Sequence, residues 1–450
     1  EIRTTVDSIN SYSQQIAELN QRIVLAQAGS NNAPNDLLDQ RDYLVAELNK
    51  LVEVNARVDS DGAYSIFYGN GQQLVIGTQV STLVAQASYE DITRIVVGVR
   101  TPSSVQELPE NLITGGSLAG LLRFRSETLD KSTNDIGRIA ATLTQTFNAQ
   151  HALGQDLLGQ ALGEGSFAGN FFTVSQPQVV ANSLNASAAT VTATFVSPTA
   201  GAGGGFYTNL TNSDYRLSYN GANYTLTRLS DNQSWSNATI GGLSTAVSAT
   251  EGFSIASAGV MAAGDSFTLM PTRFAARNIA VNSTVAADPR LIAAATPVRT
   301  TMGSGNTGSA TVSAGTVATG YALGALPVTI TYNAGTNQLT GFPGGPIAYN
   351  PVGTTVTFNG VSLQIAGTPA NNDTFLVARN TAAVSDSRNA LALGQLQTQG
   401  TVAGGTANYQ VAYARLVSDV GNKTREIQVT GEAQSALLKQ SQNARESLSG

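Results

Sequence analysis

The chain has no cysteine and a single histidine, His151, among its 450 residues. Without cysteine there is neither a disulfide nor a thiolate metal ligand. One histidine excludes the HExxH arrangement and zinc sites with two histidines, and no GxSxG nucleophile elbow accompanies it for a serine triad. We therefore expect a non-enzyme with no catalytic, cofactor-binding or metal-binding residues. We interpret His151 as structural, capping carbonyls at a helix end.

Charge is also scarce, since Asp, Glu, Lys and Arg make up 12% of the chain and give a net charge of −6. This balance argues against a nucleic-acid partner, which would need clustered Lys and Arg. No apolar run is long enough to cross a bilayer and no signal peptide opens the sequence, so we expect no membrane partner. Residues 165–213 and 300–372 contain no charged side chain. Their strands lack the charged side chains that usually protect sheet edges from pairing with other chains. Their surface is therefore either a neutral, solvent-exposed one or a contact face toward neighbouring subunits.

Three stretches have helical patterns. From Gly115 to Gly159 the pattern predicts one long amphipathic helix, with Ser117 as its cap and a buried seam at seven-residue spacing. That seam consists of Leu122, Leu129, Ile136 and Leu143. Charged residues follow at intervals of four on the opposite, solvent side, namely Arg123, Glu127, Lys131 and Asp135.

The first 28 residues predict a coiled-coil seam through Ile2, Ile9, Ile16 and Ile23. After a break at residues 29–34, a second helix is expected, with Asn35 as its cap and Asp36 and Asp39 at its positive end. Salt bridges to Arg41 or to neighbouring chains would explain its aspartates better than acid–base chemistry. Near the end, a third seam runs through Tyr413, Val420, Ile427, Gln434, Ser441 and Leu448. Its later half is weakly apolar, so we expect this helix to lie along a groove.

These stretches carry a family resemblance. The strings IAELNQRI and NDLLDQRDYLVAEL, then LAGLLRFRSETLD and TFNAQHALGQDLLG, and finally the C-terminal helix occur here in that order. Together they resemble the bacterial flagellar hook-associated protein 1 family, the hook–filament junction proteins. The resemblance implies a fragment that lacks both terminal segments of such a protein. It also gives the absence of cysteine a reason, because the family leaves the cell unfolded through a narrow export channel.

Strand patterns fill the remaining sequence. Asn-Gly pairs at residues 70–71, 220–221 and 359–360 predict hairpins, because both residues tolerate the positive φ of a type I′ turn. The segment GFSIASAGVMAAGDSFTL from Gly252 aligns without gaps to GVSLQIAGTPANNDTFLV from Gly360. We interpret the match as two related β domains in tandem.

Two motifs that suggest ligands are weak. Asp59, Asp61 and Gly62 hint at a calcium loop, but the glycine comes too early, so we expect a β-turn. GSGNTG at residues 303–308 fits GxGxxG, yet no helix follows and no carboxylate stands about twenty residues on, so we expect a flexible loop.

The predicted fold is α+β and multidomain, a discontinuous coiled-coil-like helical bundle domain with two inserted all-β domains. The helical domain comprises residues 1–165, with a small β-hairpin element at 56–114, and residues 389–450. The β domains cover 166–290 and 297–388, and the second should be excisable by joining Thr296 to Asn389. We expect Ile16→Ala and Ile136→Ala to destabilise strongly if their seams face each other, and Arg123→Ala to matter little.

The resemblance implies a structural subunit of the flagellum that forms a ring between hook and filament. Its partners would be copies of itself, the hook protein, the second hook-associated junction protein and an export chaperone that binds the missing C-terminal segment. The fragment itself should be monomeric. The location would be extracellular, after export without a cleavable signal peptide. Two alternatives stay open, a flagellin-like filament subunit and an adhesive surface protein that uses its neutral β domains.

Overall fold

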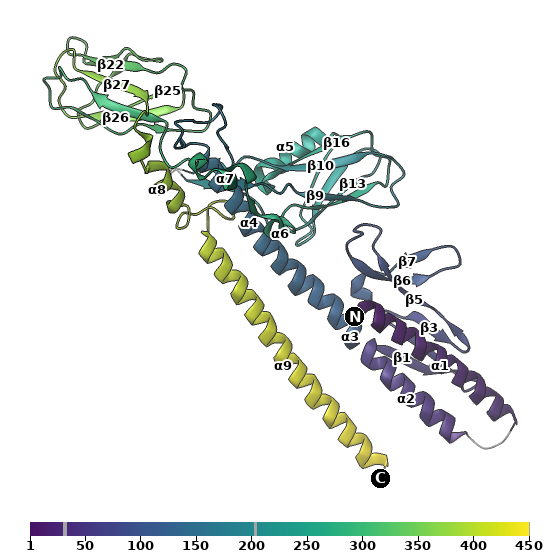
Figure 1. The fold of residues 1–450 in the computed structure, drawn as a ribbon. Coiled ribbons are helices and arrows are strands. Elements are labelled where there is room, and N and C mark those ends of the chain that lie inside the picture. Colours follow the sequence, from purple (N-terminus) through teal and green to yellow (C-terminus); the bar gives the residue numbers. More distant parts are fainter. Residues whose placement is uncertain (30–33, 202–204, 450) are drawn as a thin grey trace.

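The computed structural model describes residues 1–29, 34–201 and 205–449. The molecule is elongated (Figure 1), with the α1–α2 pair near one end, a β-rich region at the other, and α4 and α9 running side by side between them. Its α-helices are α1 Ile2–Gly29, α2 Asn35–Leu51, α3 Gly116–Phe124, α4 Asp130–His151, α5 Ile240–Glu251, α6 Ala275–Asn278, α7 Ser283–Ala287, α8 Arg388–Gln395 and α9 Tyr409–Ser449. No helix in the described ranges has the length and apolarity to cross a membrane.

The N-terminal third is one packed unit of helices and strands. A four-stranded antiparallel sheet contains β1 Val54–Val58, β2 Tyr64–Tyr68, β3 Gln72–Ile76 and β4 Gln79–Val80. A three-stranded sheet contains β5 Leu83–Ala87, β6 Ile95–Arg100 and β7 Val105–Glu107. Ile9, Ile16 and Ile23 are fully buried, which confirms the first seam. Their core is shared with α2, α3 and both sheets, so the strands form part of the helical unit and do not merely lie beside it.

Asparagine side chains tie α1 to these strands. The Asn10 amide accepts from the Leu83 N–H at 2.9 Å and donates to the Leu83 carbonyl at 2.8 Å. Asn20 pairs with Tyr64 in the same way, at 2.9 Å for each bond. Each amide thus pairs with the backbone of one strand residue and satisfies groups that burial would otherwise leave unpaired.

The predicted helix from Gly115 to Gly159 is shorter than expected and has an irregular middle. It ends at His151, and the five-residue π-helix Arg125–Leu129 joins α3 to α4. Gly115, not Ser117, occupies the cap position, and no side chain caps this end. A π turn adds a residue to the helical repeat, so positions in register before it lose that register afterwards. Leu122 is therefore buried and Leu143 is half-buried, whereas Leu129 and Ile136 are 51% and 45% exposed, so the seam prediction is wrong at these two positions.

The buried face of α4 consists of small and polar residues and not of the predicted leucine and isoleucine seam. It includes Asn134, Gly137, Ala141, Gln145 and Asn148. A Cβ atom on Gly137 would lie 1.8 Å from the Thr272 carbonyl oxygen, so α4 packs tightly against the loop before α6. Among the described elements α4 packs on α6 and α9 and not along α1, so the two predicted seams do not face each other.

The C-terminal helix α9 also departs from its predicted packing. Its first turns bury Ala412 and Leu416, and Val420 is half-buried. Tyr413 and Ile427 are 59% and 51% exposed, and every described side chain from residue 427 onward is exposed. Only the first part of α9 therefore lies along α4, and the side chain of Leu448 lies outside the described residues.

The first β region follows α4. Its strands are β8 Phe172–Thr173, β9 Gln178–Ala181, β10 Thr190–Phe195, β11 Thr199–Ala200, β12 Phe206–Tyr207, β13 Tyr215–Tyr219, β14 Tyr224–Arg228, β15 Ser234–Asn237, β16 Phe253–Ala258, β17 Ser266–Met270 and β18 Ala280–Val281. The main sheet has the antiparallel order β15-β14-β13-β17-β9, and α5 packs against β16 and β15. Thr239 caps α5 by accepting from the Gly242 N–H.

The second β region contains β19 Val298–Met302, β20 Thr311–Val312, β21 Thr316–Val317, β22 Val328–Asn333, β23 Gln338–Thr340, β24 Ile347–Ala348, β25 Thr354–Phe358, β26 Val361–Ala366 and β27 Thr374–Arg379. Its five-stranded sheet has the order β19-β27-β22-β23-β24, and β26 pairs with β20, β21 and β25 in the other sheet. Asn359 and Gly360 both have positive φ, 47° and 75°, which confirms the two-residue hairpin between β25 and β26.

All three Asn-Gly hairpins form, but only the last has positive φ at both residues of the pair. Gly71 and Gly221 have positive φ, whereas Asn70 and Asn220 are not among the left-handed residues. Four residues separate β13 from β14, and the Asn220 side chain accepts from the N–H groups of Ala222 and Asn223 inside that loop. The loop therefore closes through a side chain and not through a type I′ turn.

The internal repeat corresponds to the same substructure in the two β regions. Asp265 directly precedes β17 and accepts from the N–H groups of Ala186 and Ala262. Asp373 directly precedes β27 and accepts from Thr307, Gly308 and Ala370. Each aspartate thereby ties a preceding loop to its own turn.

The strand residue after each aspartate also has an equivalent partner. Asn185 makes a bond pair with the backbone of Ser266, and Asn306 makes the same pair with Thr374. The match therefore extends upstream of the aligned segments, to residues 185–189 and 306–310.

Candidate functional site

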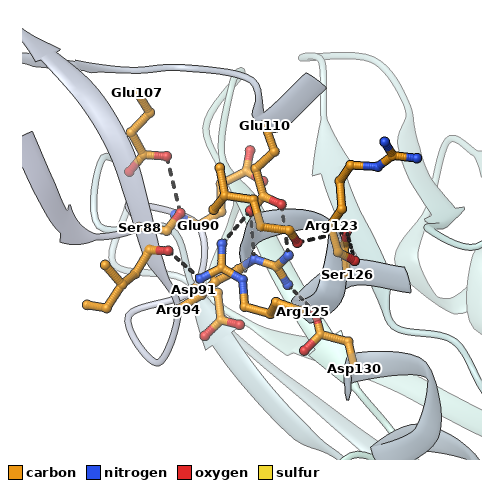
Figure 2. Close-up of polar contacts among 12 residues, drawn as sticks. Ser88, Glu90, Asp91, Arg94, Glu107, Glu110, Arg123, Arg125, Ser126 and Asp130 are labelled. Carbon is orange, nitrogen blue, oxygen red and sulfur yellow. Dashed lines mark hydrogen bonds and ion pairs between the residues drawn. The ribbon is translucent and has the colours of Figure 1, made fainter. Parts of the chain in front are cut away.

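A network of arginines and carboxylates joins the N-terminal unit to α4. Arg94, in the turn between β5 and β6, bonds to Glu110 at 3.2 Å and to Asp130, the first residue of α4, at 2.5 Å. Arg125, on the π-helix, bonds to Glu110 at 2.7 Å and to the Ile95 carbonyl. Figure 2 shows Arg94 and Arg125 converging on Glu110. The π turn thus lies where the helix meets the strands of the N-terminal unit.

A third arginine extends the network into the first β region. Arg273, between β17 and α6, bonds to Asp91 at 2.9 Å and to Asp214, which directly precedes β13. We call the seven residues Arg94, Asp91, Glu110, Arg125, Asp130, Asp214 and Arg273 the joint. A polar cleft of about 690 Å³ is lined by five of them, together with Ser126, Asn134 and Ser213.

Two arginines of the joint, Arg94 and Arg273, are held in their charged form by nearby carboxylates. Burial alone would lower the pKa of Arg94, but the Glu110 and Asp130 carboxylates raise it above its ordinary value. Burial likewise opposes the charge of Arg273, and the carboxylates of Asp214 and Asp91 raise the pKa of that guanidinium. Removing one member of such a half-buried set would leave opposite charges without partners, which is strongly destabilising. This arrangement supports mechanical attachment between parts and has none of the geometry of a nucleophile and its base.

His151 does not cap its own helix. It is fully buried, its Nδ1 lies 3.1 Å from the Gly169 carbonyl oxygen, and its Nε2 accepts from the Ala293 N–H at 3.0 Å. Because Nε2 accepts, the ring proton is on Nδ1, and burial lowers the pKa of the imidazole. The ring stacks on Phe167 with 5.8 Å between centroids. His151 therefore binds together three chain segments, and the capping prediction is wrong.

In both weak ligand motifs, polar groups bond to other groups of the protein. The GSGNTG segment is not a free loop, because Asp373 accepts from its Thr307 and Gly308 amides. Asp59 and Gly62 form the tight turn between β1 and β2, and the Asp59 carboxylate accepts from Ser65. Among the described residues, no group of three or more His, Asp or Glu side chains is arranged to hold a metal ion.

Two expectations for α2 need correction. Pro34, not Asn35, occupies the cap position of α2, and no side chain caps this end. Arg41 is buried, donates to Asn20 and to the Gly62 carbonyl, and lies 3.4 Å above the Tyr64 ring, so the α2 aspartates are not its partners. Asp42 instead accepts from the Tyr64 hydroxyl at 2.9 Å.

Sequence reasoning did not find the joint. Arg273 and Asp91 are 182 positions apart, and neither belongs to a motif or a charge run. The one indication in the sequence was the low number of charged residues in the β regions. An arginine there needs a carboxylate partner when it is buried.

Three family models match this chain in sequence order. The model described as "Flagellar hook-associated protein FlgK helical domain" matches residues 1–167, the "Flagellar hook-associated protein 1, D2-like domain" matches 180–271, and the "Flagellar hook-associated protein 1, D3 domain" matches 297–357. The first match ends beyond α4, and the other two each fall within one β region.

Whole proteins give a consistent result. Flagellar hook-associated protein 1 of Escherichia coli (strain K12) is 30% identical over all of this chain, which spans 64% of that protein. The Salmonella typhimurium (strain LT2) protein of the same name is 38% identical over 51% of this chain and 40% of its own length. The solved structure of the flagellar hook junction protein FlgK from Burkholderia pseudomallei superposes with a TM-score of 0.87 at 34% identity, covering 99% of this chain and 83% of that one. The chain therefore spans less than two thirds of the curated relatives it matches.

Proposed function

The chain belongs to the flagellar hook-associated protein 1 family, and from this we propose that it is a structural subunit of the junction between flagellar hook and filament. The observation that carries the proposal is its likeness to the Burkholderia hook junction protein over 99% of the chain. Membership in this family replaces the flagellin alternative. The same membership, together with a joint built from ion pairs, supports a protein that acts by holding parts together and not by catalysis.

The proposal assigns separate tasks to the two ends of the molecule. The paired helices α4 and α9 and the N-terminal unit would form the axial part of a ring of copies. The β regions, proposed as domains at 166–290 and 297–388, would project outward. The joint supports this division, because Arg94 and Arg273 connect the N-terminal unit to α4 and to the first β region. Force between axial and outer parts would pass through these bonds.

We further propose the partners implied by this place in the flagellum. They are copies of the chain, the hook protein on one side and the second hook-associated junction protein on the other. An export chaperone would bind the protein before secretion. The proposed location is the extracellular flagellum.

An exchange of the aligned regions tests the function. Residues 1–450 would replace the matching region of the Burkholderia protein in a strain deleted for that gene, and filament growth and swimming would be measured. We expect filaments on most hooks. A matched control carries Arg273→Ala with Arg94→Ala, which should be exported but support fewer stable filaments.

Two results would refute the proposal. One is a chimera that is exported and folded but leaves hooks bare. The other is restored swimming in a chimera that is absent from the hook–filament boundary on immunogold labelling.

A further inference from the structure

An apolar groove of about 960 Å³ lies between the start of α1, the helix around the π turn, and α6. Leu121, Phe124 and Leu129 line it from the helix, and Phe274 lines it beside α6. Phe124 and Leu129 are 52% and 51% exposed. Two large apolar side chains half exposed beside each other form the kind of patch that marks an interaction surface.

The rim of this groove is rich in arginine. Arg94, Arg125 and Arg273 line it and are bound to carboxylates of the joint. Arg3 and Arg277 also line it and are exposed, and in the described part of the chain neither makes a hydrogen bond or ion pair. The lining acids are Glu1 and Asp130, and Asp130 is bound to Arg94. The groove therefore favours an occupant that combines an apolar or aromatic side chain with neighbouring carboxylates.

The chain itself carries a surface of that chemistry on α2. Asp36, Asp39 and Tyr43 are spaced by three and four residues, so they lie on one face of the helix. All three are exposed, and Tyr43 is 64% exposed. The only lysine of α2, Lys50, is at the far end and is bound to Glu47. We call this set of three residues the acidic face of α2.

We propose that the groove receives the acidic face of α2 from a second copy of this chain. Tyr43 would pack on Phe124 and Leu129, and Asp36 and Asp39 would pair with Arg277 and Arg3. The argument is charge complementarity between two surfaces that have no partner within the described chain. Because the two surfaces differ, the contact is head-to-tail, and its repetition gives a ring or a helical row. The proposal rests on the proposed function and adds which surfaces meet.

The absence of cysteine permits a clean crosslinking test. A Tyr43→Cys chain and a Phe124→Cys chain, one with a tag that changes its mobility, are mixed at high concentration and oxidised. We expect the mixed dimer to exceed both like-with-like dimers, because disulfide formation needs Cα atoms within about 7 Å. The matched control pairs Phe124→Cys with Leu184→Cys, a residue 68% exposed in the first β region, and should crosslink at the background rate.

Charge reversal tests the pairing. Arg277→Glu in the Phe124→Cys chain should slow mixed-dimer formation about fivefold, the effect of losing an exposed ion pair of about 1 kcal/mol. Asp36→Arg in the Tyr43→Cys chain should restore the rate when combined with Arg277→Glu. High salt should slow the unmodified pair, since exposed charges are screened.

Three outcomes would overturn the inference. The first is mixed-dimer formation no faster than with the Leu184→Cys control. The second is insensitivity to charge reversal. The third is crosslinking of Phe124→Cys in intact flagella to a different component, with none between copies. Each can occur while the chimera still supports filament growth, so failure of this contact is distinguishable from failure of the proposed function.

Discussion

His151 should make the stability of this protein depend on pH in a narrow window. The imidazole is fully buried and neutral, and both of its nitrogens are bonded to backbone groups of distant segments. Burial lowers its pKa in the folded chain, whereas the unfolded chain has the ordinary value of about 6.5. Between these two values the unfolded state binds a proton that the folded state does not. Acidification therefore favours unfolding, and stability is lost as the pH falls below about 6.5.

The magnitude follows from proton linkage. For one such group the free energy of unfolding falls by up to about 1.4 kcal/mol per pH unit, until the folded-state pKa is reached. His151→Leu removes this dependence. It also leaves the buried Ala293 N–H without a partner, at a cost of about 1–3 kcal/mol at pH 7, and removes the partner of the half-buried Gly169 carbonyl.

Because the chain has one histidine, its Cε1–H proton gives a single NMR resonance whose titration reports the pKa directly. We expect a midpoint clearly below 6.5. Urea unfolding at several pH values between 5 and 7 should show the predicted loss in the unmodified chain and a flatter profile in His151→Leu. Carboxylates contribute equally to both proteins, so the difference isolates the imidazole. A midpoint at or above 6.5, or identical profiles in the two proteins, would refute the reasoning.

Three further predictions follow from the packing. Ile16→Ala should lower the free energy of unfolding by about 2–5 kcal/mol in denaturant titrations, because Ile16 is fully buried. Ile136→Ala, at a half-exposed position, should lower it by about 0.5 kcal/mol, like the surface control Arg123→Ala. Equal losses for the two isoleucines would contradict the observed burial. Joining Thr296 to Asn389 should retain the helical far-UV signal and cooperative melting. The Thr296 N–H bonds to the Asp386 carboxylate, so the two ends of the second β region lie close together. Loss of either signal would show that the helical part needs this region to fold. Asp373→Asn should lower the temperature of the calorimetric transition of the second β region, and Asp265→Asn should lower that of the first. An amide has one acceptor oxygen and cannot accept all the N–H bonds that the carboxylate accepts. A shift in the transition of the other region would refute this assignment.

Local patterns in the sequence predicted local structure well. The isoleucine seam of α1 and the hairpin at Asn359–Gly360 both depend on neighbouring residues, and the structure confirms each. The repeat was visible because a glycine with positive φ and then an aspartate recur in the loop before β17 and in the loop before β27. Family membership was accessible for a similar reason, since most of its strings lie in the helices.

The seam of α4 shows where such reasoning fails. A heptad count assumes an uninterrupted α-helix, and the π turn at Arg125–Leu129 rotates Leu129 and Ile136 out of the register of Leu122. No single residue type in this segment predicts a π turn. The joint was missed for a different reason, because the partners of Arg273 come from segments 59 and 182 positions away and meet only in the folded molecule.

The duplicated aspartate has a consequence for how this molecule can change over evolutionary time. Asp265 and Asp373 each fasten a loop to the turn before the final long strand of their own region, so each region closes on itself. The second region also begins and ends at one place, because Asn380 bonds to the Thr296 carbonyl and Arg388 to that of Val298. A self-closing unit with adjacent ends can be copied, lost or exchanged at a single position of the gene. The helices beneath it would need no compensating substitutions, and the outer surface of the molecule can diversify while its interior stays constant.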